Sequence, residues 1–297
     1  MTARWIRQPE RGSRSLIRLI GWIALNVGRW AARLLLYPIT LYFILTARAQ
    51  RRASRQFLSR ALGRKARWWN VARHFHCFSG TILDRVYLVA GDRRRFDLQM
   101  HGVDVALEHV TAGRGHILLG AHLGSFEVMR MLAMTDDRVN MKVLMHADHN
   151  ATLANLIYSL NPRFSESIIP IGGIDALLRV QECLNRGEMV GILGDRVVEN
   201  DKTTRCRFFG HEATFPSGPV LLASMLKAPV LLFFGLYLGK NRYALHFELF
   251  ADQIAIRRDH RAEDIRLWTQ RYADRLEHYA RLAPYNWFNF YDFWGES

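Results

Sequence analysis

From about residue 68 onward, short apolar runs alternate with longer stretches of helical periodicity, and this alternation constrains the fold most strongly. A strand followed by a helix, repeated along a chain, is typical of an α/β fold with a largely parallel sheet flanked by helices. The predicted strands are Ile117–Leu119, Val143–Met145, Ile168–Pro170, Val190–Leu193, Val230–Leu236 and Ala244–Phe250. The predicted helices are Arg67–Ala90, Phe126–Met134, Ala151–Leu160, Ile174–Asn185, Gly218–Leu226 and Ala262–Leu282.

The positive charge of the chain is concentrated before this alternation begins. Residues 1–67 contain 15 Lys or Arg residues and a single acid, Glu10, whereas acids and bases balance in the remainder. The same segment holds the most apolar stretches of the chain, Leu16–Gly28 and Leu34–Leu45. We therefore expect residues 1–67 to form a helical membrane anchor and residues 68–297 to form the α/β domain.

The form of this anchor is left open by the sequence. The uncharged stretch Leu34–Leu45 is shorter than the ~20 residues that a straight spanning helix needs. An amphipathic or re-entrant segment whose arginines meet anionic headgroups fits as well as a single span. The alternative is a hydrophobic helical hairpin packed on the domain. Nucleic-acid binding would suit a sequence pI near 10.2 but does not explain why arginines flank an apolar segment.

Several classes of protein lack support in the sequence. The three cysteines are far apart and form no CxxC pair, which argues against a disulfide framework or a zinc site and suits a reducing cytoplasm. His146 and His149, with Asp148 between them, provide too few ligands for a metal site. There is no G-x-S-x-G elbow, phosphate-binding loop or dinucleotide fingerprint. The sequence therefore does not support a metal site or a hydrolase, NTPase or dehydrogenase function.

The strongest candidate for catalysis is His122, which follows the apolar run Ile117–Leu119. Glycines at 120 and 124 would let a substrate approach the backbone, and Ser125 is a plausible N-cap that places Glu127 in the first turn of a helix. A histidine held by a carboxylate in one tautomer is the arrangement that a general base needs. The alternative is a structural histidine near a sheet edge, because this spacing also arises by chance.

Two further segments place polar residues where strands end. Asp195 and Arg196 follow the run Val190–Leu193, where Arg196 could pair with a phosphate or carboxylate and Asp195 could order it or a turn. A solvated loop pair is the alternative. The stretch 203–217 is expected to be a loop that opens a helix at Gly218, and such an N-terminus can hold an anion.

Taken together, these residues resemble the lysophospholipid acyltransferase superfamily, and most closely its lipid A late acyltransferase branch. The branch's His-x4-Asp/Glu motif matches His122 to Glu127, and its strand ending in an acid matches Gly191 to Arg196. Its Phe-Phe-Gly step and its Ala-Pro-Val strand match residues 208–210 and 228–230. The order of these motifs agrees from about residue 16 to 290. The chain departs from the branch in having Arg196 in place of the usual Gln, and a neutral to acidic aromatic segment, Pro284–Trp294, in place of a basic end. That segment could be an interfacial belt, an acyl-chain lining or plain core.

This resemblance implies an O-acyltransferase that moves an acyl group from acyl carrier protein or acyl-CoA to a hydroxyl of a membrane lipid or glycolipid. His122 would be the general base and Glu127 would orient its ring. Asp195, Arg196 and Gly210 would bind substrate, and backbone N–H groups near Gly120 or Gly210 would hold the oxyanion. The resemblance implies that no metal or bound cofactor is required. The implied location is the cell inner membrane with the catalytic domain on its cytoplasmic side. Two alternatives are a non-catalytic membrane-surface protein that binds anionic lipid through its basic N-terminus, and an acyltransferase for a simpler acceptor.

Overall fold

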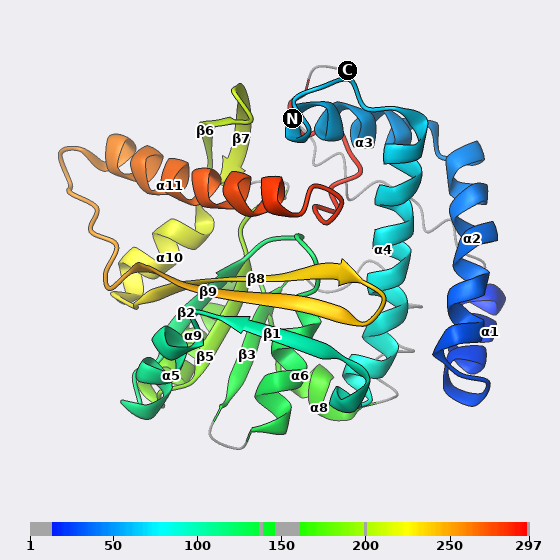
Figure 1. Ribbon diagram of the computed structural model, residues 1–297. Coiled ribbons are helices and arrows are strands. Elements are labelled where there is room, and N and C mark those ends of the chain that lie inside the picture. Colours follow the sequence, from blue (N-terminus) through cyan, green and yellow to red (C-terminus); the bar gives the residue numbers. More distant parts are fainter. Residues whose placement is uncertain (1–13, 137–138, 146–160, 199–200, 296–297) are drawn as a thin grey trace.

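A seven-stranded sheet forms the centre of the molecule (Figure 1). The computed structural model describes residues 14–136, 139–145, 161–198 and 201–295. The strand order is β1-β9-β8-β2-β5-β3-β4; β8 and β9 are antiparallel, and the other neighbouring pairs are parallel. The strands are β1 Asp97–His101, β2 His116–Gly120, β3 Met141–Met145, β4 Ile168–Pro170, β5 Met189–Leu193, β8 Val230–Gly239 and β9 Arg242–Ala251. The predicted α/β fold with a largely parallel sheet is confirmed.

Helices cover both faces of this sheet, as expected from the apolar character of its strands. Every residue of β2 is buried, and its side chains alternate between two core clusters, with Ile117 and Leu119 in one and Leu118 in the other. The first cluster also takes in side chains of α3 Arg48–Ala61, α9 Gly173–Asn185, α10 Gly218–Leu226 and α11 Arg261–Leu282. The second takes in side chains of α1 Arg14–Asn26, α2 Arg29–Thr46, α4 Trp68–Val89, α5 Val103–Thr111 and α6 Glu127–Thr135.

Some elements were not predicted. Strand β1 is mostly exposed at the sheet edge and alternates polar residues with Leu98 and Met100, so it carries no apolar run. The short helices α5 and α8 Pro162–Glu166 were also missed. The stretch expected to be a loop is instead a hairpin of β6 Thr203–Phe208 and β7 His211–Pro216. In β6, Cys206 and Phe208 are buried between exposed arginines, which is the two-residue alternation of a strand. The predicted helix Ala151–Leu160 lies outside the described residues.

The N-terminal helices pack on the rest of the chain through α4. Helices α1 and α2 form a hairpin on the side of α4 that faces away from the sheet (Figure 1). The Arg29 guanidinium on α2 pairs with the buried Asp84 carboxylate on α4 at 2.7 Å, and the Tyr243 hydroxyl of β9 donates to the same carboxylate at 2.9 Å. This packing agrees with the helical-hairpin alternative, whereas the boundary at residue 67 stays a prediction.

The membrane-anchor prediction is not confirmed by the helices alone. Within the described ranges, no single helix is long and apolar enough to cross a membrane. Helices α2 and α3 satisfy the length and composition criteria only as a pair, and they are bent by 97° at the break between them. The outer face of the α1–α2 hairpin nevertheless exposes an unusual number of large apolar side chains, namely Leu19, Trp22, Leu25, Val27, Trp30, Leu34, Tyr37, Leu41, Tyr42 and Leu45.

Candidate active site

His122 lies in the loop that leaves the C-terminal end of β2. Its carbonyl accepts a hydrogen bond from the Phe288 N–H at 2.8 Å, and the Gly124 N–H donates to the Asn286 carbonyl at 2.9 Å. Gly124 has φ +72°, and a Cβ there would lie 1.9 Å from the Gly235 carbonyl oxygen, so only glycine fits. The loop is therefore fixed between β8 and the C-terminal segment.

The His122 ring is held by Asp195 across the sheet. Its Nδ1 lies 2.7 Å from Asp195 Oδ1, and the His122 backbone N–H donates to both carboxylate oxygens at 3.1 Å. Strands β2 and β5 are parallel neighbours, with Gly120 opposite Leu193. The loops that follow the two strands therefore leave the same edge of the sheet side by side, which brings His122 to Asp195.

The ionisation of this pair suits a base. Burial alone would raise the pKa of Asp195, but the charge and hydrogen bonds of His122 hold it at about 2. Burial, with the positive charge of Arg196, lowers the pKa of His122, and Asp195 opposes this shift. The ring is thus neutral near pH 7 with its proton on Nδ1 facing the carboxylate. The side chain is 26% exposed, and Nε2, the ring nitrogen that does not face Asp195, carries the lone pair.

Glu127 does not hold the His122 ring, contrary to the sequence-based expectation. Its carboxylate pairs with the Arg85 guanidinium of α4 at 3.2 Å and accepts a hydrogen bond from the Ser125 hydroxyl at 3.4 Å. Glu127 does lie in the first turn of α6, but the N-cap is Phe126 rather than Ser125. Proximity in the sequence favoured Glu127, whereas strand pairing places Asp195 at the ring.

The other two predicted substrate-binding residues differ in their settings. Arg196 donates from Nε to Asn289 Oδ1 at 2.7 Å and from Nη2 to the Phe288 carbonyl at 2.9 Å, so it is no freely solvated loop residue. Its burial lowers the pKa of its guanidinium. Gly210 lies in the exposed turn of the β6–β7 hairpin with φ +77°. It borders a hollow shared with Asp274 and Arg281 of α11. Asp195 is fully buried and bonds protein groups rather than facing solvent.

The site also contains residues that sequence reasoning assigned no role. The Trp287 indole N–H and the Asn289 amide N–H both donate to Asp195 Oδ2 at 2.9 Å. Both side chains are buried, with 0% and 1% exposure, which agrees with the core alternative for these two residues of the aromatic segment. Trp287 and Asn289 are two residues apart, and Asn289 is a polar residue between two phenylalanines. This spacing is the one sequence signal that could have indicated that the two side chains bind the same acceptor.

A comparison with known protein families shows which family the chain belongs to. The model of the bacterial lipid A biosynthesis acyltransferases matches residues 3–295. The chain belongs to this family. No curated protein matches it significantly. As a member of this acyltransferase family, the protein is a transferase associated with lipid A biosynthesis, and the family indicates acyl transfer to a lipid acceptor.

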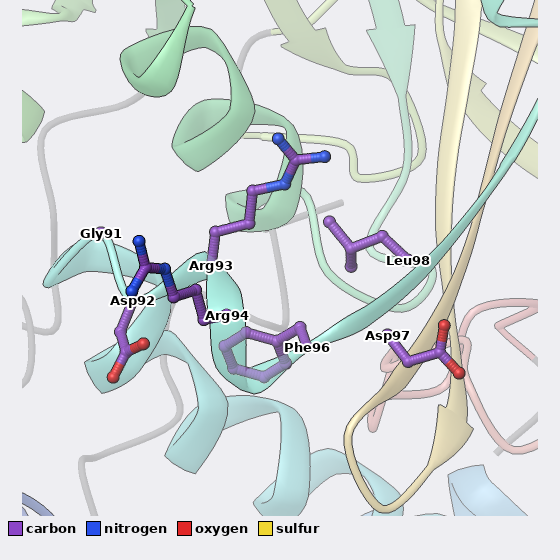
Figure 2. A pocket seen from close by; sticks show the side chains of 7 residues that line it. All are labelled: Gly91, Asp92, Arg93, Arg94, Phe96, Asp97 and Leu98. Atoms are coloured by element: carbon purple, nitrogen blue, oxygen red, sulfur yellow. The ribbon is translucent and has the colours of Figure 1, made fainter.

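A second surface hollow lies outside the His122 region. This hollow, at the short helix η1 Arg93–Arg95, is lined by Gly91, Asp92, Arg93, Arg94, Phe96, Asp97 and Leu98 (Figure 2), and no predicted site residue lines it. His146, Asp148 and His149 lie outside the described residues. Within the part of the chain that the structure describes, no group of three or more metal-ligating side chains occurs.

Proposed function

We propose that this family member transfers an acyl group from a thioester, carried by acyl carrier protein or coenzyme A, to a hydroxyl of a membrane lipid or glycolipid. The observation that carries the proposal is the His122–Asp195 pair, with Nδ1 at 2.7 Å from a fully buried carboxylate and a side chain that is 26% exposed. A neutral imidazole held in one tautomer with an accessible Nε2 is suited to general-base catalysis.

The reaction requires only groups of the chain and the two substrates. Nε2 of His122 takes the proton of the acceptor hydroxyl while its oxygen attacks the thioester carbonyl carbon. The tetrahedral intermediate collapses and the carbon–sulfur bond breaks. The leaving thiolate takes the proton from Nε2, which restores the neutral imidazole. The ionised Asp195 stabilises the transient imidazolium through Nδ1. N–H groups near Gly120 or Gly210 remain candidates for binding the oxyanion.

Arg85 and Glu127 are proposed to tune this base rather than to touch its ring. The positive charge of Arg85 lowers the pKa of His122. Glu127 pairs with Arg85 at 3.2 Å and thereby offsets part of that charge. Glu127 thus keeps a place in the site as a positioning residue, and Arg196 remains a candidate for contact with an anionic part of a substrate.

Association with a membrane is part of the proposal. Two features support it: the apolar outer face of the α1–α2 hairpin and the exposed basic residues that follow it on and after α3, namely Arg48, Arg52, Arg55, Arg64, Lys65 and Arg67. An apolar face enters the acyl boundary of a bilayer, and basic residues beside it attract anionic headgroups. We propose the inner membrane, with the catalytic domain on its cytoplasmic side.

The direct test is acyl transfer by the purified full-length protein in detergent. Labelled acyl carrier protein or acyl-CoA is incubated with total membrane lipid from a Gram-negative host, and labelled lipid is measured. The His122→Ala variant is expected to lose roughly 10²–10⁴-fold in rate, as removal of a general base requires. The matched control is His260→Ala, which alters an exposed histidine that pairs with Glu263. Equal labelling by wild type and His122→Ala would refute the catalytic assignment.

A further inference from the structure

We infer that Trp287 and Asn289 are positioning residues that set the proton affinity of His122 through Asp195. This inference deepens the proposed function and rests on it. The two side chains touch neither the imidazole nor, within the proposed reaction, the substrate. They act on the carboxylate that holds the base.

The hydrogen bonds around Asp195 divide between its two oxygens. Among side-chain donors, Oδ1 accepts from the His122 ring at 2.7 Å, whereas Oδ2 accepts from Trp287 Nε1 and from Asn289 Nδ2, both at 2.9 Å. The His122 backbone N–H donates to both oxygens at 3.1 Å. The carboxylate is fully buried, so the protein alone stabilises its charge. Two N–H donors on Oδ2 therefore fix both the orientation of the carboxylate and the distribution of its charge.

The segment that carries these donors is itself fastened to both catalytic loops. The Phe288 N–H donates to the His122 carbonyl at 2.8 Å, and Arg196 donates to Asn289 Oδ1 at 2.7 Å. The Trp287 carbonyl lies 2.9 Å from Nε2 of the buried His74 on α4. His122, Asp195, Asn289, Arg196 and Phe288 thus form a closed ring of hydrogen bonds, which leaves the carboxylate little freedom to turn away from the base.

The chemical consequence is a weaker acceptor at Oδ1. Hydrogen bonds to Oδ2 stabilise the ionised carboxylate and draw negative charge away from the oxygen that faces Nδ1. The imidazolium is then favoured less strongly, which works with burial and with Arg196 to keep His122 unprotonated near neutral pH. Removing either donor should concentrate the charge on Oδ1 and raise the pKa of His122.

The test compares Trp287→Phe and Asn289→Ala with two matched controls in the same segment. Trp294→Phe removes an indole that donates to the Phe208 carbonyl at 3.3 Å, and Asn286→Ala removes an amide that bonds the backbone of Tyr237. We measure the pH profile of kcat/KM for acyl transfer and the pKa of His122 by NMR titration. The test variants are expected to move the acid limb and the NMR pKa upward by roughly 0.5–1 pH unit, a shift typical of one hydrogen bond or charge.

The controls are expected to change the melting temperature without moving the His122 pKa. Folded test variants whose His122 titrates like the wild type would overturn the inference. Should Asn289→Ala fail to fold, Asn289→Ser provides a second variant, because a hydroxyl donor should restore part of the wild-type pKa. The NMR titration needs no substrate, so failure of the proposed acyl transfer and failure of this inference are distinguishable.

Discussion

At the residue scale, one buried carboxylate organises the site. The Oδ1 atom of Asp195 accepts a hydrogen bond from the His122 ring, Oδ2 accepts from Trp287 and Asn289, and both oxygens accept from the His122 backbone N–H. From the sequence, His122 was predicted to be the general base, and Asp195 and Arg196 were predicted to bind substrate. The ring was assigned to Glu127 because five residues of separation are visible in a sequence, whereas the pairing of β2 with β5 is not.

The Asp195→Asn variant tests this organisation. A neutral amide can present its NH2 group to Nδ1 and favour the wrong tautomer, so we expect kcat/KM to fall by roughly 10²–10⁴-fold. Since Asp195 raises the pKa of His122, its loss should also move the acid limb of the profile to lower pH. Glu127→Gln should shift that limb less, because Glu127 acts only through Arg85. A larger shift for Glu127→Gln than for Asp195→Asn would contradict this ranking.

At the scale of elements, the helices and strands that could be predicted from the sequence are those with a clear pattern of apolar residues. Strands such as β5 and β8 and the long helices α4 and α11 were predicted because each buries a continuous or periodic apolar surface. Strand β1 was missed because it is short and mostly exposed and has only two apolar residues, so its place depends on backbone pairing with β9. The β6–β7 hairpin was missed because its turn residues suggested a loop.

The attachment of α2 to α4 provides a test at this scale. Burial raises the pKa of Asp84, and Arg29 counteracts that effect. Arg29→Met leaves the carboxylate buried without its charge partner, a change that costs about 3–5 kcal/mol in unfolding free energy. The penalty should be larger at pH 8 than at pH 5, because protonation of Asp84 removes the unpaired charge.

The control for this measurement is a surface ion pair. Arg205 and Glu212 pair at 3.3 Å with side chains that are 75% and 64% exposed. Arg205→Met should therefore change the unfolding free energy by less than about 1 kcal/mol. Denaturant unfolding of both variants at the two pH values checks the prediction, and equal losses in Arg29→Met and Arg205→Met would contradict it.

At the scale of the whole molecule, many of the exposed large apolar side chains are gathered on the α1–α2 hairpin. The α1–α2 hairpin presents its apolar face on the side of α4 that is turned away from the sheet (Figure 1). The exposed arginines of α3 follow it directly in the chain. The sequence left open whether this segment is a single span, an amphipathic or re-entrant anchor, or a hairpin packed on the domain. In the structure, a bent and partly packed hairpin buries one face and leaves the other apolar.

This distribution of apolar and basic residues predicts how the protein binds lipid. Replacing Trp22, Trp30 and Leu34 together by Gln should reduce binding to vesicles of mixed zwitterionic and anionic lipid at both low and high salt, because apolar burial is insensitive to screening. Replacing Arg52, Arg55 and Arg64 by Gln should weaken binding only at low salt. Co-sedimentation with vesicles measures both effects. Unchanged binding of the Trp22, Trp30 and Leu34 variant would show that this face does not meet the bilayer.

The sequence separation between the residues of the candidate site bears on the order in which the protein folds. His122 meets Asp195 across 73 residues, and Asp195 meets Trp287 across 92, whereas α1 and α2 are joined by a short turn. Contacts between remote segments form late in folding, and local ones form early. We therefore expect a half-folded molecule to possess the α1–α2 hairpin, which we propose binds lipid, before it assembles the His122–Asp195 pair that we propose as the base. On that proposal, arrival at the bilayer would precede the onset of chemistry.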